Sequence, residues 1–474
     1  MALEGDVGAG PAVDLTTGSI PRGVLSIALP MIGASIFHSI QSLVDMKFVA
    51  ILGSSSIAAV GMAGQVMFTL IAAFMGLSTA TVAMVSRAVG AGDEDRASHV
   101  AGQALTFAVI LSVGVGGAGF LASPLIMRIL GARPDVAELG MSYLYVVFSG
   151  MFFLMAAFIL GGILRGAGDA VTPLLLGILT TVLNVILNPI FIFGSYGVPA
   201  MGVRGSAVAT VLARFFSFAV GAWVLLGGRL RVKVRPADFV PNLGTMWRLV
   251  AIGVPSSVQM MIRSFMSLVL MSVVAQFGTL VVAAYTVGMR VRMLGLMPSF
   301  GFAGAAATMV GQNLGAGKPE RSEKSAYTAA GMAVGVSICA ASAFALFAPW
   351  LVAFFKDDPT VVPVGTRMLR ITSVGIVMAP IGIIFGRSMN GAGDTTSPLV
   401  ITLLALWGFQ IPAAIWLSGI EAVWGVPIPL RSLFASVATG SETGIWYAMI
   451  AASALQAVIC TAWFKVGRWK RKMV

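Results

Sequence analysis

Residues 87–96 read Arg-Ala-Val-Gly-Ala-Gly-Asp-Glu-Asp-Arg, and residues 312–321 read Gln-Asn-Leu-Gly-Ala-Gly-Lys-Pro-Glu-Arg. In both segments a Gly-Ala-Gly sequence is followed, after two further residues, by an acidic residue and an arginine. Each follows a long apolar run and precedes another. The second segment lies 225 positions after the first.

Other segments are repeated with the same offset. A Gly-Ala-Gly-Asp sequence occurs at 166–169 and again at 391–394, Pro30 corresponds to Pro255, and Gly53 corresponds to Gly278. Apolar helices can resemble one another by chance, but chance would not keep the same offset of 225 residues through the loops and glycines between them. The two halves of the chain are therefore duplicates of one another.

The composition excludes a water-soluble protein. Of the 474 residues 58% are hydrophobic and only 10% are charged, whereas a soluble surface needs about 25% charged residues. The apolar residues form runs of about 20 residues or more, long enough to cross a bilayer as helices. A membrane β-barrel would instead show short alternating segments. The sequence predicts an all-α integral membrane protein.

Twelve membrane-spanning helices are expected, six in each half. An even number per half means that both copies enter the membrane from the same side, so they are parallel repeats related by a pseudo-two-fold axis along the membrane normal. The expected spans are 24–52, 57–86, 99–127, 139–164, 171–194, 203–227, 248–277, 280–311, 324–355, 366–389, 397–419 and 444–465.

The spans divide the chain into two lobes with short flanking segments. The formal net charge is +12, and the basic residues gather in loops on one side of the predicted membrane, which indicates cytoplasmic termini and a plasma-membrane location rather than nucleic-acid binding. The expected parts are a cytoplasmic tail at 1–22, an N-lobe at 23–228, an inter-lobe loop at 229–247, a C-lobe at 248–466 and a basic cytoplasmic tail at 467–474.

Asp45 is the only acidic residue that falls within a predicted span. An ionised side chain at the centre of a membrane helix costs about 2.5–3.5 kcal/mol, so such a residue indicates a functional site. Its partner in the second half is Leu270, which means that only the N-lobe carries the carboxylate. The structural alternative is an ion pair with Lys47, although residues two apart on a helix point to different faces.

Three further polar residues are expected beside Asp45. Asn184 and Asn188 lie four residues apart on one helical face, and Ser206 begins the next span. A carboxylate, two amides and a hydroxyl form a set of oxygen ligands suited to a proton or Na⁺. The two amides could instead form hydrogen bonds between helices without binding an ion.

Two other groups of residues have candidate roles. His38, Gln41 and Ser42 share a stripe of the first helix with Asp45, so they could form a proton relay, or they could be packing residues. Intramembrane arginines and methionines could line a substrate cleft, although the arginines could also extend to the membrane surface. The cleft candidates are Arg263, Arg290, Arg292, Met62 and Met289.

These residues resemble the multidrug and toxic compound extrusion (MATE) family of the multidrug/oligosaccharidyl-lipid/polysaccharide flippase (MOP) superfamily. The resemblance covers residues from about 22 to 466. Its marks are Leu43–Gly53, Val310–Gly317, Leu164–Asp169 and Asn184–Phe193.

The resemblance implies an antiporter that exports organic cations and other amphipathic toxins in exchange for H⁺ or Na⁺. Within the family the chain looks closest to the DinF-like branch, in which an Asp, an Asn and a Thr correspond to Asp45, Asn184 and Ser206. Asn188 departs from that branch, where an aspartate is usual, and the missing charge puts Na⁺ binding by two carboxylates in doubt.

A flippase and an enzyme are the two alternatives to an antiporter. Cleft arginines also fit a flippase for lipids or lipid-linked oligosaccharides, but those relatives usually have fourteen spans. An enzyme would need a nucleophile and base or a set of metal ligands, and the chain has only two histidines and one buried acid. We therefore expect no catalysis and no cofactor, with membrane lipid and small amphipathic substrates as partners of a functional monomer.

Overall fold

The computed structural model describes residues 14–195, 197–227, 232–356, 358–420, 422–423, 426–427 and 439–472. Parts of the predicted N-terminal tail, inter-lobe loop and C-terminal tail, at 1–13, 228–231 and 473–474, lie outside the described residues.

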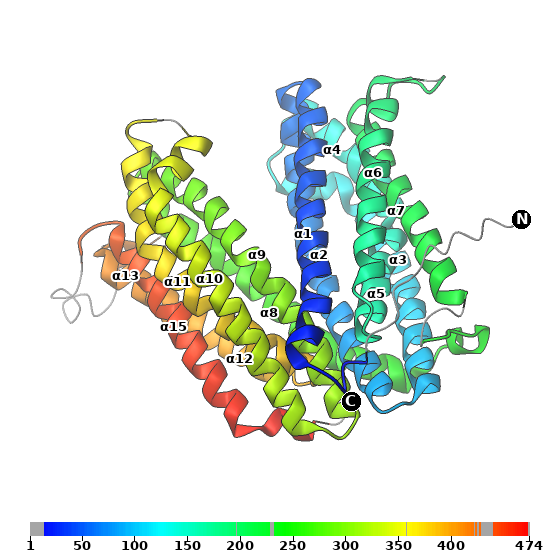
Figure 1. Ribbon diagram of the computed structural model, residues 1–474. Coiled ribbons are helices and arrows are strands. Elements are labelled where there is room, and N and C mark those ends of the chain that lie inside the picture. The colour runs from blue at the N-terminus through cyan, green and yellow to red at the C-terminus, as the bar shows by residue number, and fades with distance from the viewer. Residues whose placement is uncertain are drawn as a thin grey trace, which may run out of the picture.

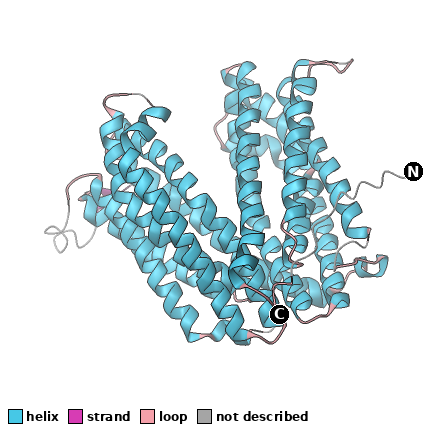
Figure 2. Cartoon of the chain, viewed as in Figure 1, coloured by secondary structure: helices cyan, strands magenta, loops and turns pink. Residues whose placement is uncertain are grey.

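The described chain is almost entirely helical (Figure 2). The first half contains α1 (Ile20–Ile51), α2 (Ser54–Gly90), α3 (Glu94–Ile129), α4 (Pro134–Ser149), α5 (Met151–Gly166), α6 (Val171–Phe193) and α7 (Gly202–Leu226). The second half contains α8 (Leu243–Ala275), α9 (Thr279–Gly315), α10 (Pro319–Phe355), α11 (Val361–Gly391), α12 (Thr396–Thr402), the π-helix η2 (Leu403–Gln410), α13 (Ile411–Ser418) and α15 (Thr443–Val466). Short elements are η1 (Pro236–Phe239), η3 (Arg468–Arg471) and the antiparallel pair β1 (Ala422–Val423) and β2 (Val426–Pro427).

Within the described residues, eleven helices are long and apolar enough to cross a membrane, with α12, η2 and α13 forming one span. The bent pair α4 and α5 supplies a twelfth. The two helices meet at Gly150 with a bend of 52°, and a serine–glycine pair is a common cause of such a kink. The prediction of an all-α membrane protein with twelve spans is confirmed.

The two Gly-Ala-Gly segments at 90–92 and 315–317 lie where the two halves of the molecule touch each other. A Cβ atom added at Gly90 would overlap the backbone carbonyl of Gln312, and one added at Gly315 would overlap the carbonyl of Arg87. Because 87 and 312 correspond, as do 90 and 315, exchanging the two halves reproduces the same contact. This is the arrangement expected around a two-fold axis.

The Gly-Ala-Gly-Asp sequences connect one helix to the next. Gly168 and Gly393 have φ angles of +92° and +90°, which favour glycine. The backbone N–H of Thr172 donates to Oδ1 of Asp169 (2.9 Å), and the Ser397 hydroxyl donates to Oδ2 of Asp394 (2.7 Å). The acidic residue of each copy therefore stabilises the start of a helix.

The described parts of both tails, residues 14–19 and 467–472, lie on one side of the helices, which we call the termini side (Figure 1). The Arg321 guanidinium donates to the Thr17 carbonyl (2.6 Å), and the Arg87 guanidinium donates to the Lys472 carbonyl (2.7 Å). Trp469 is fully buried. Figure 1 shows α1–α7 and α8–α15 as two groups that converge on the termini side and diverge on the opposite side.

Candidate functional site

Asp45 belongs to the C-terminal part of α1 (Ile20–Ile51), and this end of the helix lies on the side of the molecule opposite the termini (Figure 1). Its carboxylate oxygen Oδ1 accepts a hydrogen bond from Nδ2 of Asn188 in α6, at 2.5 Å. This bond joins two of the residues that the sequence singles out. Because Asn188 is fully buried, the carboxylate is held against a part of the protein that excludes bulk water.

The hydrogen bonds continue from Asn188 into two other residues. Nδ2 of Asn188 also donates to Oδ1 of Asn184 (3.0 Å), and Nδ2 of Asn184 donates to Oγ1 of Thr210 in α7 (3.1 Å). The four side chains therefore form a continuous polar network across α1, α6 and α7. In a low-dielectric interior such a network fixes the orientation of each member.

One acceptor in this network is unused. Oδ1 of Asn188 is buried and has no hydrogen-bond partner within the part of the chain that the structure describes. A buried polar atom without a partner costs about 1–3 kcal/mol. The position next to this oxygen is therefore favourable for a proton donor or a small cation.

The neighbouring face of α7 carries three polar residues one helical turn apart. Ser206 is buried and precedes Thr210 by one turn. Arg214 follows by another turn, and its guanidinium interacts electrostatically with Asp45 and with Tyr143 of α4. The sequence pattern pointed to Ser206 but not to Thr210 or Arg214, which follow Ser206 by four and eight residues; the charge of Arg214 within a predicted span was the signal that could have found it.

The residues proposed as a proton relay occupy different environments. Gln41 is buried, whereas His38 and Ser42 are exposed. His38 interacts electrostatically with Arg214. Hydrogen bonds among the described residues do not connect these three side chains to one another, so a relay through them would require intervening water.

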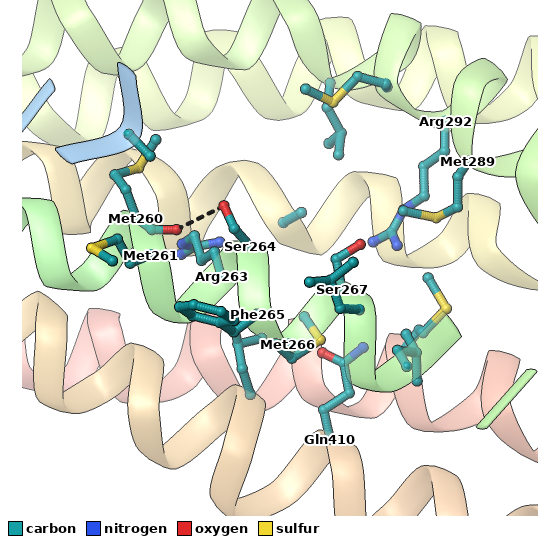
Figure 3. A pocket seen from close by; sticks show the side chains of 18 of the residues that line it. Met260, Met261, Arg263, Ser264, Phe265, Met266, Ser267, Met289, Arg292 and Gln410 are labelled. Carbon is teal, nitrogen blue, oxygen red and sulfur yellow. Dashed lines mark hydrogen bonds between the residues drawn. The ribbon is translucent and has the colours of Figure 1, made fainter. Parts of the chain in front are cut away.

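A cavity of about 510 Å³ lies mainly within the second half of the molecule. Its wall combines parts of α8, α9, α11, η2 and α15 with one stretch of α2 that includes Gln65 and Phe68. Of the predicted cleft residues, Arg263, Arg292 and Met289 line this cavity (Figure 3). Arg290 is instead exposed outside it, and Met62 packs against the core of the first half.

Arg292 extends from α9 into the cavity beside Met289, with its guanidinium directed toward Ser267 (Figure 3). The side chain is only 9% exposed, and its Nε atom has no hydrogen-bond partner among the described residues. Gln410 reaches the cavity from η2. The ion pairs formed within the described chain do not include Arg263 or Arg292.

These features define a duplicated, helical integral membrane protein with a carboxylate site in one half and a cationic cavity in the other. The family model described as MatE matches residues 30–190 and 255–416, and so the chain belongs to the MatE family. The two matches begin 225 positions apart, which is the offset of the internal repeat.

Similarity to individual members extends over nearly the whole chain. A probable multidrug resistance protein NorM of Thermotoga maritima is 25% identical and aligns with 96% of this chain and 94% of its own length. An FAD transporter of Shewanella oneidensis is 25% identical, with 90% and 94% covered. A solved multidrug resistance MATE family transporter, described as outward-facing, superposes with a TM-score of 0.87 at 26% identity and covers 98% of this chain and 99% of its own.

Proposed function

We propose that this chain is a multidrug efflux antiporter that exports small amphipathic compounds in exchange for H⁺ and/or Na⁺ by alternating access. It carries out transport without catalysis, as a functional monomer in the plasma membrane. Relatives named for multidrug resistance over nearly the full chain support the efflux activity. The coupling to a cation is supported by the site around Asp45.

The observation that carries this coupling is the hydrogen bond between Asp45 and Asn188, next to the unpartnered Oδ1 of Asn188. A carboxylate in a membrane interior is costly unless its charge is balanced. A proton on Asp45 would neutralise it, and Na⁺ would bring a positive charge to oxygens of Asp45, Asn188, Asn184 and Ser206. A coupling site in the N-lobe is also what the DinF-like branch implies.

The divergence of the two helix groups agrees with one state of the transport cycle. With the termini in the cytoplasm, the diverging side faces outward, as in the outward-facing structure that superposes on this chain. In this state the cation reaches Asp45 and changes the packing of α1 against α6. The inward-facing state then takes up substrate, and coupling requires the two ligands to favour different states.

The membrane potential supplies enough energy for this exchange. One positive charge that moves inward through 100 mV releases about 2.3 kcal/mol. That corresponds to roughly fifty-fold accumulation of a neutral substrate. A single titrating or cation-binding carboxylate is therefore sufficient for efflux.

The test is transport by Asp45→Asn in proteoliposomes with imposed pH or Na⁺ gradients. We expect the wild type to export ethidium or an anionic amphiphile when a gradient is applied, and the variant to lose gradient-driven export while remaining folded. Asp135→Asn is the matched control, because Asp135 is an exposed acid that accepts a hydrogen bond from Ser55 at 2.8 Å. Normal gradient-driven export by Asp45→Asn would disprove the coupling site.

A flippase for lipids or lipid-linked oligosaccharides is the second candidate, favoured by the two arginines that line the cavity. The two functions differ in what crosses the membrane. Vesicles that contain a fluorescent lipid and the purified protein would show headgroup translocation for a flippase, whereas an efflux antiporter would leave the lipid in its original leaflet.

A further inference from the structure

The cavity in the second half has an unbalanced charge. Among the 26 residues that line it, Arg263 and Arg292 are positively charged and none is an aspartate or glutamate. Neither arginine forms an ion pair with any residue of the described chain. The positive charge of this wall is therefore not neutralised by an ion pair within the part of the chain that the structure describes.

The rest of the wall is suited to an apolar body. Four aromatic residues and six methionines line the cavity together with several other apolar side chains, and methionine adapts its shape to different ligands. Uncharged polar side chains interrupt this apolar wall, among them Ser267, toward which the Arg292 guanidinium is directed, and Gln410 from η2 (Figure 3). An apolar pocket with a few fixed polar groups is typical of a small-molecule site.

Of the side chains that line the cavity, Arg292 has the clearest need for a bound anion. Its side chain is more than nine-tenths buried, and its Nε donor is unpartnered among the described residues. A buried guanidinium is stable when a carboxylate, sulfonate or phosphate accepts its hydrogen bonds. A cationic ligand would add like charge in a low dielectric, which opposes binding.

We propose that this cavity binds amphiphiles with an anionic headgroup, which Arg292 and Arg263 hold while the methionine and aromatic side chains pack against the apolar body. This inference rests on the proposed efflux function and names the substrate class for it. The headgroup can belong to an exported compound or to a membrane lipid, since both present the same chemistry to the arginines.

Competition binding to the purified full-length protein tests the charge preference. In this experiment tritiated cholate is bound to the protein and then challenged with unlabelled cholate, with cholate methyl ester or with ethidium. The methyl ester has the same steroid body as cholate but lacks its negative charge. We expect cholate to compete at least about tenfold better than its ester, because a hydrogen bond to a charged group contributes that much. Stronger competition by the ester or by ethidium would overturn the proposal.

Three variants assign the preference to the cavity. Arg292→Gln should weaken cholate binding about tenfold and leave binding of the ester unchanged, and unchanged ester binding also shows that the variant is folded. Arg292→Lys, which keeps the charge, should retain part of the affinity. Arg290→Gln is the control, since Arg290 lies two residues away on α9 but is exposed outside the cavity. Cholate affinity that does not change in Arg292→Gln would contradict the assignment.

Lipid composition distinguishes the two sources of the headgroup. Nanodiscs made of phosphatidylcholine alone are compared with nanodiscs that also contain phosphatidylglycerol. Loss of cholate binding in the second membrane would assign the site to a lipid headgroup, whereas equal binding would assign it to a free amphiphile. If cholate binds but no compound is exported under a gradient, the proposed efflux function is wrong and this inference stands. If ethidium is exported under a gradient but cholate does not bind, this inference is wrong and the proposed efflux function stands.

Discussion

Asn188 combines two properties that a second aspartate could not. Its amide group donates to both Asp45 and Asn184, and its carbonyl oxygen Oδ1 remains unpartnered among the described residues. An aspartate at this position would add a second negative charge beside Asp45 and could not donate either hydrogen bond. The amide therefore stabilises one carboxylate without raising the charge of the site.

Exchanging this amide for a carboxylate should change the ion preference. We expect Asn188→Asp to gain Na⁺ binding, because two adjacent carboxylates require a cation to neutralise their charge. Since a ligand that binds only the folded state stabilises it, NaCl should raise the midpoint of thermal unfolding of this variant more than that of the wild type, relative to choline chloride.

Asn390→Asp is the matched control for this experiment. Asn390 is likewise buried with an unpartnered Oδ1, but it lies in α11, in the other half of the molecule. Equal Na⁺ protection of both variants would show that the effect is not specific to the site around Asp45.

The sequence predicts some members of this site and not others. Asp45 stands out because it is charged within an apolar run, and Asn184 and Asn188 stand out because the second half has Phe409 and Ala413 in their places. A threonine in an apolar helix has no such contrast, which explains why Thr210 was missed. The orientation of each amide decides that Oδ1 of Asn184 accepts a hydrogen bond while Oδ1 of Asn188 does not. A sequence pattern carries no information about side-chain orientation.

At the scale of elements, α2 and α9 touch backbone to backbone on the termini side. Gly90 leaves space only for the carbonyl of Gln312. Gly64, in the same helix, has open space where a Cβ atom would be added. Replacing each glycine by alanine therefore distinguishes the effect of the close helix contact on stability from the effect of helix propensity.

We expect Gly90→Ala to lower the stability of the purified protein by about 1–3 kcal/mol, because the added methyl group must push the two helices apart. Gly64→Ala should instead gain about 0.5–1 kcal/mol, the usual preference for alanine over glycine in a helix. The measurement is the midpoint of thermal unfolding in detergent. If both variants shifted in the same direction, the close contact would not limit stability.

Hydropathy locates the helices well but does not detect irregularities inside them. The expected spans agree with the observed ones within a few residues at most ends, because the length of an apolar run is visible in the sequence. The break at Gly150 and the π-helix η2 remain hidden, since their residues are as apolar as their neighbours. Each depends on how the helix packs, which a window of hydrophobicity does not report.

At the scale of the whole molecule, alternating access predicts opposite movements at the two sides. Ser54 and Thr279 are exposed positions that correspond in the repeat, on the side opposite the termini, and Asp95 and Glu320 form a corresponding exposed pair on the termini side. In a background without Cys339 and Cys460, spin labels at these pairs report the distance between the two halves.

We expect the Ser54–Thr279 pair to approach and the Asp95–Glu320 pair to separate when the inward-facing state is populated by removing the coupling ion and adding substrate. The physical reason is that the two groups of helices rock as rigid bodies, so that the contact around Gly90 and Gly315 on the termini side opens while the opposite side closes. Distances measured by double electron–electron resonance in nanodiscs test this. Changes of the same sign at both pairs would exclude rocking.

The ends of the chain also take part in the closed termini side. Trp469 stacks on Phe464 with ring centroids 4.5 Å apart, Lys470 pairs with Glu323 at 2.6 Å, and the carbonyl of Lys472 accepts from Arg87. The C-terminal residues in these contacts, Phe464, Trp469, Lys470 and Lys472, follow the second MatE match, which ends at residue 416. Under the proposed transport cycle, we therefore expect a change in the C-terminal segment to alter how readily the termini side opens without touching either proposed binding site. The speed of transport and the choice of substrate would then be encoded in separate parts of the sequence.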